Sequence, residues 1–402
     1  MRRQTIRGCL IPLALLAGAP LASAQDGMAP EVAAASSTGL LAQMASPQAI
    51  SDYRRRLAEY QAAREAYEAE ASAYWSAIAE KRRGRNAKRR EHQVVTLDDY
   101  VLAQPPVYAG PRRPANPTGE PEAETVPRPR RIIPVVADLL KAASDYYQWA
   151  PQRPATETEF KRAYARFAAS AGLTREQAVR VYAFETGGNG SHDMQAGLSS
   201  WRPGAHAIST AIGYNQLLTT NSVELIAEQG PLFLKLLTQR AASLSGPARQ
   251  LMETKIAVLK QMVALARSVP DEWGEHEKIG DTPQGWALHA MVLDVDVGPM
   301  LQTHKLLTSV RFARSKGYDR PLTAAELEMM NLTGDGTGLD MVTMPQVMRE
   351  QVPSANFFQR SGYERNPVAS RNNTVAKLLA VTETRMDSNS NQPGARELAA
   401  AF

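Results

Sequence analysis

The sequence predicts a mainly α-helical protein, and three observations support that prediction. Helix-capping pairs precede apolar residues at helical spacing, as in Thr156 with Glu159 and Thr174 with Gln177. The alternation of apolar and polar residues that marks a strand is scarce. Prolines are concentrated between residues 104 and 134, where they separate an N-terminal helical region from the rest. We therefore expect a helical domain preceded by a long helix and a Pro-rich linker.

Residues 1–24 are typical of an export signal. Three arginines, Arg2, Arg3 and Arg7, precede an apolar run from Leu10 to Leu21. Ala22-Ser23-Ala24 after it is a typical cleavage site. No other segment is apolar over the roughly eighteen residues needed to cross a bilayer. We expect an exported protein, periplasmic or secreted, that is soluble after cleavage near Ala24, with residues 25–48 as a flexible leader.

Cysteine usage and charge narrow the chemistry. The single cysteine, Cys9, lies in the expected signal, so the mature chain is expected to lack thiol chemistry, disulfides and cysteine metal sites. No His-Glu-x-x-His motif occurs, and we expect neither a metal nor another cofactor. A net charge of +5 favours anionic cell-wall or membrane surfaces, and nucleic acid is a poor partner for an exported chain.

Residues 49–92 predict a long helix with a basic end. Its apolar residues follow alternating steps of four and three, a heptad period that Arg64 interrupts. The pattern fits either a coiled coil that self-associates through residues 49–80 or an amphipathic helix laid against the main domain. The basic run at 81–90 is either a contact for an anionic envelope surface or a solvated face.

The remaining chain is divided by its capping and breaking signals. Residues 93–153 are expected to form a Pro-rich linker and a packing segment, 154–385 the main domain, and 386–402 a flexible tail. Asn221 is expected to cap a helix that ends at Gly230-Pro231. The other expected elements are helices at 156–172, 174–187, about 248–267, 284–308 and 323–331, and at most a small hairpin between Gly188 and Ala211.

The helix that begins at Thr174 carries a single acid, Glu185, in line with an apolar stripe that includes Ala178, Val181 and Tyr182. In the last turn of a helix, beside apolar neighbours, both the helix dipole and desolvation favour the protonated form of a carboxyl group. The sequence therefore predicts a raised pKa for Glu185, as a general acid requires. The alternative is an exposed or salt-bridged carboxylate at a helix end.

A second motif follows the acid. Glu185-Thr186-Gly187 precedes Ala211-x-Gly213-x-x-Gln216-Leu217 by about thirty residues. Over about fifty residues this pair of motifs resembles that of the soluble lytic transglycosylases and goose-type lysozymes, whose usual motifs are Glu-Ser-x followed by Gly-x-x-Gln. The resemblance implies a lysozyme-like helical domain with Glu185 as the sole acid/base, supported by Thr186. It also implies a glycan groove lined by Gly213, Tyr214, Asn215 and Gln216.

The third motif of that family, Ala-Tyr-Asn, has no counterpart in this sequence. Three segments are candidate substitutes: Asn331-Leu-Thr-Gly334, Tyr363-Glu-Arg-Asn366 and Asn372-Asn373, with Tyr363 as a candidate contact of the acid. The resemblance implies cleavage of the β-1,4 MurNAc-GlcNAc bond of peptidoglycan with an anhydro-sugar product. Two alternatives stay open: a hydrolytic muramidase, for which Asp193 is the only loop acid close in sequence, and a catalytically silent cell-wall binding or assembly protein.

Overall fold

The computed structural model describes residues 46–117, 133–198 and 205–402. The described residues fall into two compact units, one of residues 46–117 and one of residues 133–198 and 205–402. The described parts of both units are mainly helical, which confirms the expected mainly α-helical class. In these parts, β-type backbone hydrogen bonding is confined to isolated bridges. The expected signal and most of the leader lie outside the described residues. None of the described helices is long and apolar enough to cross a membrane.

The N-terminal unit is built on α1 (Pro47–Arg90), a single helix of 44 residues that confirms the expected long helix. Ser46 caps it by accepting a hydrogen bond from the Ala49 N–H. After the short 3-10 helix η1 (Leu97–Asp99), the chain runs back along α1, where Tyr108 packs edge-on against the rings of Tyr60 and Tyr67. The apolar seam of α1 is therefore covered in part by its own chain.

Arginine and lysine side chains of α1 hold this returning segment. The guanidinium of Arg64, which interrupts the heptad pattern, stacks 4.8 Å from the centre of the Tyr108 ring. Arg85 stacks on Tyr100 at 4.3 Å and donates to the Asp99 carbonyl, and Lys88 pairs with the Asp99 carboxylate. The segment after α1, expected to be an extended linker, thus packs along the helix as far as Tyr108, and part of the basic run binds it.

The C-terminal unit opens with α2 (Val136–Tyr147), α3 (Glu157–Ala171) and α4 (Arg175–Thr186). Thr156 caps α3 by accepting from the Glu159 N–H, and Gly172 ends it with φ of 92°. Thr174 and Gln177 form the expected capping box at the start of α4. The expected boundaries of both helices are confirmed.

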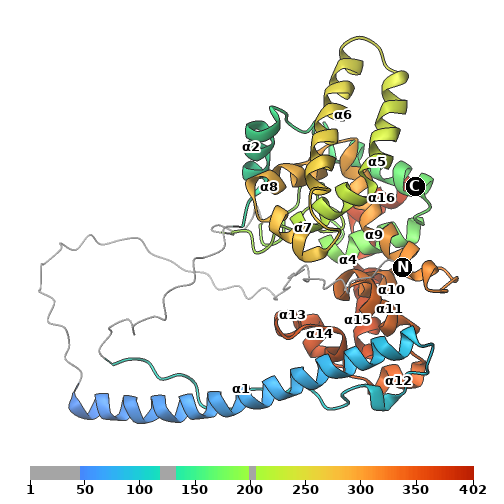
Figure 1. Cartoon of the computed structure of the whole chain (residues 1–402). Helices are drawn as coiled ribbons and strands as arrows, with labels where there is room; N and C mark the ends of the chain where they lie inside the picture. Colours follow the sequence, from blue (N-terminus) through green and yellow to red (C-terminus); the bar gives the residue numbers. More distant parts are fainter. Residues whose placement is uncertain (1–45, 118–132, 199–204) are drawn as a thin grey trace, which may run out of the picture. The chain divides into compact units, whose positions relative to one another are not determined.

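The next two helices, α5 (Thr219–Ala242) and α6 (Gly246–Ala266), form a hairpin that extends beyond its neighbours (Figure 1). The expectation that the first of them ends at Gly230-Pro231 is wrong. Proline has no N–H for the carbonyl four residues earlier, and this carbonyl, of Ala227, accepts a 2.6 Å hydrogen bond from Nε of Arg267 instead. Because the freed carbonyl has a new donor, the helix continues through Pro231.

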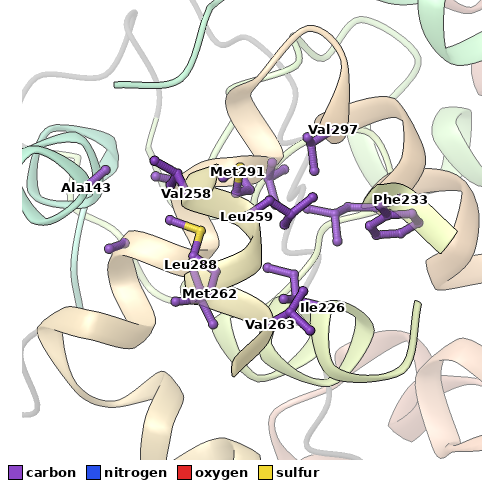
Figure 2. Close-up of a cluster of buried hydrophobic side chains, with 14 of the residues drawn as sticks. Ala143, Ile226, Phe233, Val258, Leu259, Met262, Val263, Leu288, Met291 and Val297 are labelled. Carbon is purple, nitrogen blue, oxygen red and sulfur yellow. The ribbon is translucent and has the colours of Figure 1, made fainter. Parts of the chain in front are cut away.

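Close packing of α5 on α6 forms a large part of the core. A Cβ at Gly230 would lie 2.3 Å from a methyl carbon of Val263, so only glycine allows this approach. Figure 2 shows Ile226 and Phe233 of α5 grouped with Leu259 and Val263 of α6 in one buried apolar cluster. The cluster continues into α8 (Pro283–His289) and the 3-10 helix η2 (Ala290–Leu293).

Two expectations in this region need correction. The helix expected at 284–308 is divided into α8, η2 and α9 (Val297–Ser315), because the carboxylate of Asp294 accepts from the N–H groups of Asp296 and Val297 and begins a new helix there. A helix not expected from the sequence, α7 (Trp273–Gly280), lies between α6 and α8 in the chain.

The chain ends in a series of mostly short helices. The first, α10 (Ala324–Thr333), confirms the helix expected at 323–331. The flexible tail expected at 386–402 is wrong, because the end of α15 (Val375–Ser390) and all of α16 (Pro393–Ala401) occupy it. Leu398 is fully buried, and Glu397 pairs with Lys161 at 2.6 Å. The elements after α10 are α11 (Asp335–Thr343), α12 (Gln346–Gln351), η3 (Ser354–Phe357), α13 (Arg360–Glu364), α14 (Pro367–Arg371), α15 (Val375–Ser390) and α16 (Pro393–Ala401).

Candidate active site

The position of Glu185 follows from the burial of α4 on nearly all sides. From Gln177 to Thr186 every residue of α4 except Arg180 is buried, and the helix contacts α3, α10, α15 and α16. The amide of Gln177 donates to the Leu322 carbonyl, which ties the start of α4 to the segment before α10. Gly187 and Gly188, both with positive φ, end α4.

Glu185 is a buried acid with one hydrogen-bond donor. Its side chain is on α4, the residue is 2% exposed, and Oε1 accepts a 3.1 Å hydrogen bond from Nδ2 of Asn331 on α10. Apart from the neighbouring carboxyl group of Glu328, its second oxygen has no hydrogen-bond partner among the described residues. Burial raises the pKa of Glu185 to about 7, although the charge of Lys305 and hydrogen bonds from Glu328 and Asn331 oppose the rise.

The neighbouring carboxyl group is that of Glu328. It is on α10 one turn before Asn331, is fully buried, and lies within hydrogen-bonding reach of Glu185. Two carboxylates in contact repel each other, so such a pair keeps at least one proton. Burial first, and then the charge of Glu185, raise the pKa of Glu328 well above its usual value.

Lys305 of α9 and Asn331 also line a pocket that lies beside the pair. The pocket has a volume of about 40 Å³, enough for roughly three water molecules. Asn331 therefore lines the pocket and also donates a hydrogen bond to Glu185. The other lining residues are Asn221, Glu224, Leu225, Trp273, Thr308, Ser309, Met330 and Asp335.

The residues of the Gly-x-x-Gln motif form a tightly folded loop, and their side chains are buried. Tyr214 is fully buried, packs at 4.8 Å on the ring of Tyr182 in α4, and donates its hydroxyl hydrogen to Glu157. Burial, the charge of Glu157 and that hydrogen bond raise the pKa of Tyr214. Tyr182 lies one turn before Glu185, so this loop packs on the helix that carries the acid.

The other three motif residues are held in the same way. The backbone N–H of Asn215 donates to Oε1 of Gln302, and its side-chain amide donates to Tyr164. Gln216 has φ of 44° and donates to the Gly213 carbonyl. A Cβ at Gly213 would lie 2.1 Å from Nε2 of Gln302, so close approach to α9 requires glycine.

Two further residues expected near the acid have other partners. The Thr186 hydroxyl donates to the Tyr182 carbonyl within α4, a bond to the helix backbone. Tyr363 of α13 is buried and packs on Phe358 at 5.9 Å. Of the three candidate substitutes for the missing motif, the segment beginning at Asn331 is the one with a hydrogen bond to Glu185.

Asp193, the only loop acid close to Glu185 in sequence, is held elsewhere. It pairs with Arg153 and accepts a 2.6 Å hydrogen bond from the Ser191 hydroxyl. Burial favours its neutral form, but the Ser191 hydrogen bond and the charges of His192 and Arg153 outweigh burial and lower its pKa. Asp193 is thus a carboxylate with its own partners.

Sequence reasoning identified Glu185 and the Asn331 segment but missed Glu328 and Lys305. One signal was present for Glu328: it lies among apolar residues of a helix that Thr323 and Glu326 cap, on the face of Asn331. Among the described residues no cluster of three or more His, Cys, Asp or Glu could hold a metal ion. Comparison with protein-family models, curated proteins and solved structures finds no match for this chain.

Proposed function

We propose that this protein is a peptidoglycan lytic transglycosylase that cleaves the β-1,4 MurNAc-GlcNAc bond with Glu185 as its single acid and base. The observation that supports this most is the environment of Glu185: a buried carboxyl group with a pKa near 7 and one oxygen free of backbone and amide donors. An acid whose pKa lies near the working pH can both donate and take back a proton.

The proposed reaction needs no second base. Glu185 donates its proton to the bridging oxygen as the bond from C1 of MurNAc to that oxygen breaks. The acetamido oxygen of MurNAc stabilises the charge at C1. The Glu185 carboxylate then removes the proton of the MurNAc 6-hydroxyl, whose oxygen bonds to C1 and gives the anhydro sugar. Asn331 holds one carboxylate oxygen during these steps, and the other oxygen carries the proton.

The hydrolytic alternative needs a second carboxylate that positions water across the sugar from the acid. Such pairs lie about 5 to 9.5 Å apart so that a sugar fits between them. Glu328 lies within hydrogen-bonding reach of Glu185 and has a strongly raised pKa, and Asp193 is held by Arg153 and Ser191. Neither arrangement suits a catalytic base, which favours the anhydro-sugar route over hydrolysis.

One observation favours a second candidate, a silent cell-wall binding or assembly protein with a lysozyme-like domain. Glu185 is only 2% exposed, and the pocket beside it reaches Asn331 and Lys305 without including the acid. A transglycosylase must open this region so that a glycan strand reaches the carboxyl group. A silent binder needs no such opening.

The test is digestion of purified cell wall by the full chain, with mass spectrometry of the released fragments. Glu185→Gln removes the proton but keeps the shape, so we expect fragment release to fall by about 10²- to 10⁴-fold. Asp193→Asn, which changes a carboxylate outside the site, is the matched control and retains release. Fragments with reducing ends in place of anhydro ends would support the muramidase. Sedimentation with cell wall but no release by the wild type would support the silent binder.

A further inference from the structure

We propose that Glu328 is a positioning residue for the acid: it keeps its proton at neutral pH and donates it in a hydrogen bond to the carboxylate of Glu185. Its effect on catalysis rests on the proposed function. The shared hydrogen bond does not, because it belongs to the folded chain with or without a glycan.

The geometry of α10 supports this role. Glu328 and Asn331 are one turn apart on that helix, so both side chains face α4, where Glu185 ends the apolar stripe. Glu328 is 0% exposed, and besides Glu185 the hydrogen-bonding group that acts on it is the side-chain amide of Asn331. A lone buried carboxylate would be very costly in free energy, whereas a protonated carboxyl group with an acceptor beside it is not.

The local charge balance leads to the same state. The charged or titratable groups that act on Glu328 are Glu185 from α4 and Lys305 from α9, and the amide of Asn331 is neutral. One lysine balances one carboxylate. The second carboxyl group of the pair therefore stays protonated, and Glu328 is the more deeply buried of the two.

This arrangement makes Glu185 a usable acid. Burial alone would make Glu185 retain its proton so strongly that donation to a leaving oxygen is slow. Hydrogen bonds from Glu328 and Asn331 stabilise the carboxylate that forms when the proton leaves. Glu185 then regains a proton from the sugar hydroxyl, and Glu328 keeps its own proton throughout.

The test measures the two carboxyl groups directly, by NMR titration of the full chain labelled with ¹³C at the glutamate carboxyl carbons. In the wild type we expect one buried glutamate to titrate near neutral pH and another to remain protonated well above it. Glu328→Gln keeps a hydrogen-bond donor, so the Glu185 midpoint stays near the wild-type value. Glu328→Met removes the donor, and we expect the midpoint to rise by about 1–2 pH units, the worth of one hydrogen bond to a charged group.

Two results would overturn the proposal: titration of Glu328 below pH 5, or equal Glu185 midpoints in the Gln and Met variants. If Glu328→Met does not fold, Glu185→Gln gives the same information, because loss of the neighbouring charge should lower the Glu328 midpoint. The basic limb of the pH profile of cell-wall digestion should follow the NMR midpoints. Correct midpoints without digestion by the wild type would refute the proposed function and leave the hydrogen-bonded pair intact.

Discussion

Two of the buried charged clusters in the C-terminal unit differ in their hydrogen bonding. In the first, Lys255 of α6 lies between Asp294, at 2.9 Å, and Asp296. The carboxylate of Asp294 also accepts from the backbone N–H groups of Gln152, Asp296 and Val297, each at 3.0 Å. This paired cluster joins α6, the start of α9 and the segment before α3.

The second place is the Glu185-Glu328 pair, which has a single amide donor and a lysine nearby. Both carboxyl groups have raised pKa values, chiefly because of burial. Asp294 also has a pKa raised by burial, but Lys255 and the backbone donors give it specific partners. The difference indicates that the paired cluster serves the fold, whereas the carboxyl pair costs stability and keeps a mobile proton.

The largest stability effect should come from breaking the paired cluster. Lys255→Ala leaves Asp294 and Asp296 buried without their shared cation, and we expect a loss of about 3–5 kcal/mol in the free energy of unfolding. Urea denaturation at pH 7 measures it. Lys278→Ala removes a lysine that is 72% exposed and paired with Glu275, so its loss should be about 0–1 kcal/mol. Equal losses in both variants would contradict the structural role.

Removal of the Glu185 carboxyl group should raise the free energy of unfolding. The folded-state pKa of Glu185, about 7, lies above its ordinary value of 4.5, so the folded chain binds more protons and loses stability as pH rises between these values. Glu185→Gln abolishes this loss. We expect it to stabilise the fold by about 3 kcal/mol at pH 8 and to leave stability nearly unchanged at pH 4.

Thermal and urea unfolding at both pH values measure this difference. Asp193→Asn is the contrasting control, because the pKa of Asp193 is lowered and its carboxylate stabilises the fold above its ordinary pKa. That variant should therefore lose stability at pH 8. A Glu185→Gln variant that is less stable than the wild type at pH 8 would show that the acid is as well paired as Asp294.

The sequence was sufficient for the elements whose signals are local. Thr156 and Thr174 each bond the backbone three residues ahead, and Gly172 adopts a positive φ, so the limits of α3 and α4 follow from neighbouring residues alone. The placement of Glu185 at the buried end of α4 followed from the same helix.

Contacts between residues distant in sequence were not predictable in this way. The helix α5 passes Pro231 because Arg267 supplies a donor, and Glu328 meets Glu185 only after α10 packs on α4. No residue near Pro231 or Glu328 in sequence indicates these partners. The sequence offers three candidate segments for the missing third motif, all of them polar and rich in Gly or Asn. It therefore does not indicate which of them contacts the acid, a contact that Asn331 makes in the structure.

The smallest loss of stability should come from an uncharged group, the backbone carbonyl of Ala227. The Ala227 carbonyl, freed by Pro231, has the Arg267 side chain as its donor, and Arg267→Met leaves this partly buried oxygen without that bond. We expect a loss of about 1–3 kcal/mol, the cost of one unsatisfied buried polar group. Arg249→Met, which removes an arginine of α6 in an exposed pair with Glu253, should lose at most about 0.5 kcal/mol. Restoration of stability in Arg267→Met by Pro231→Ala, which returns an N–H to that carbonyl, would attribute the loss to the freed carbonyl and not to packing of the arginine.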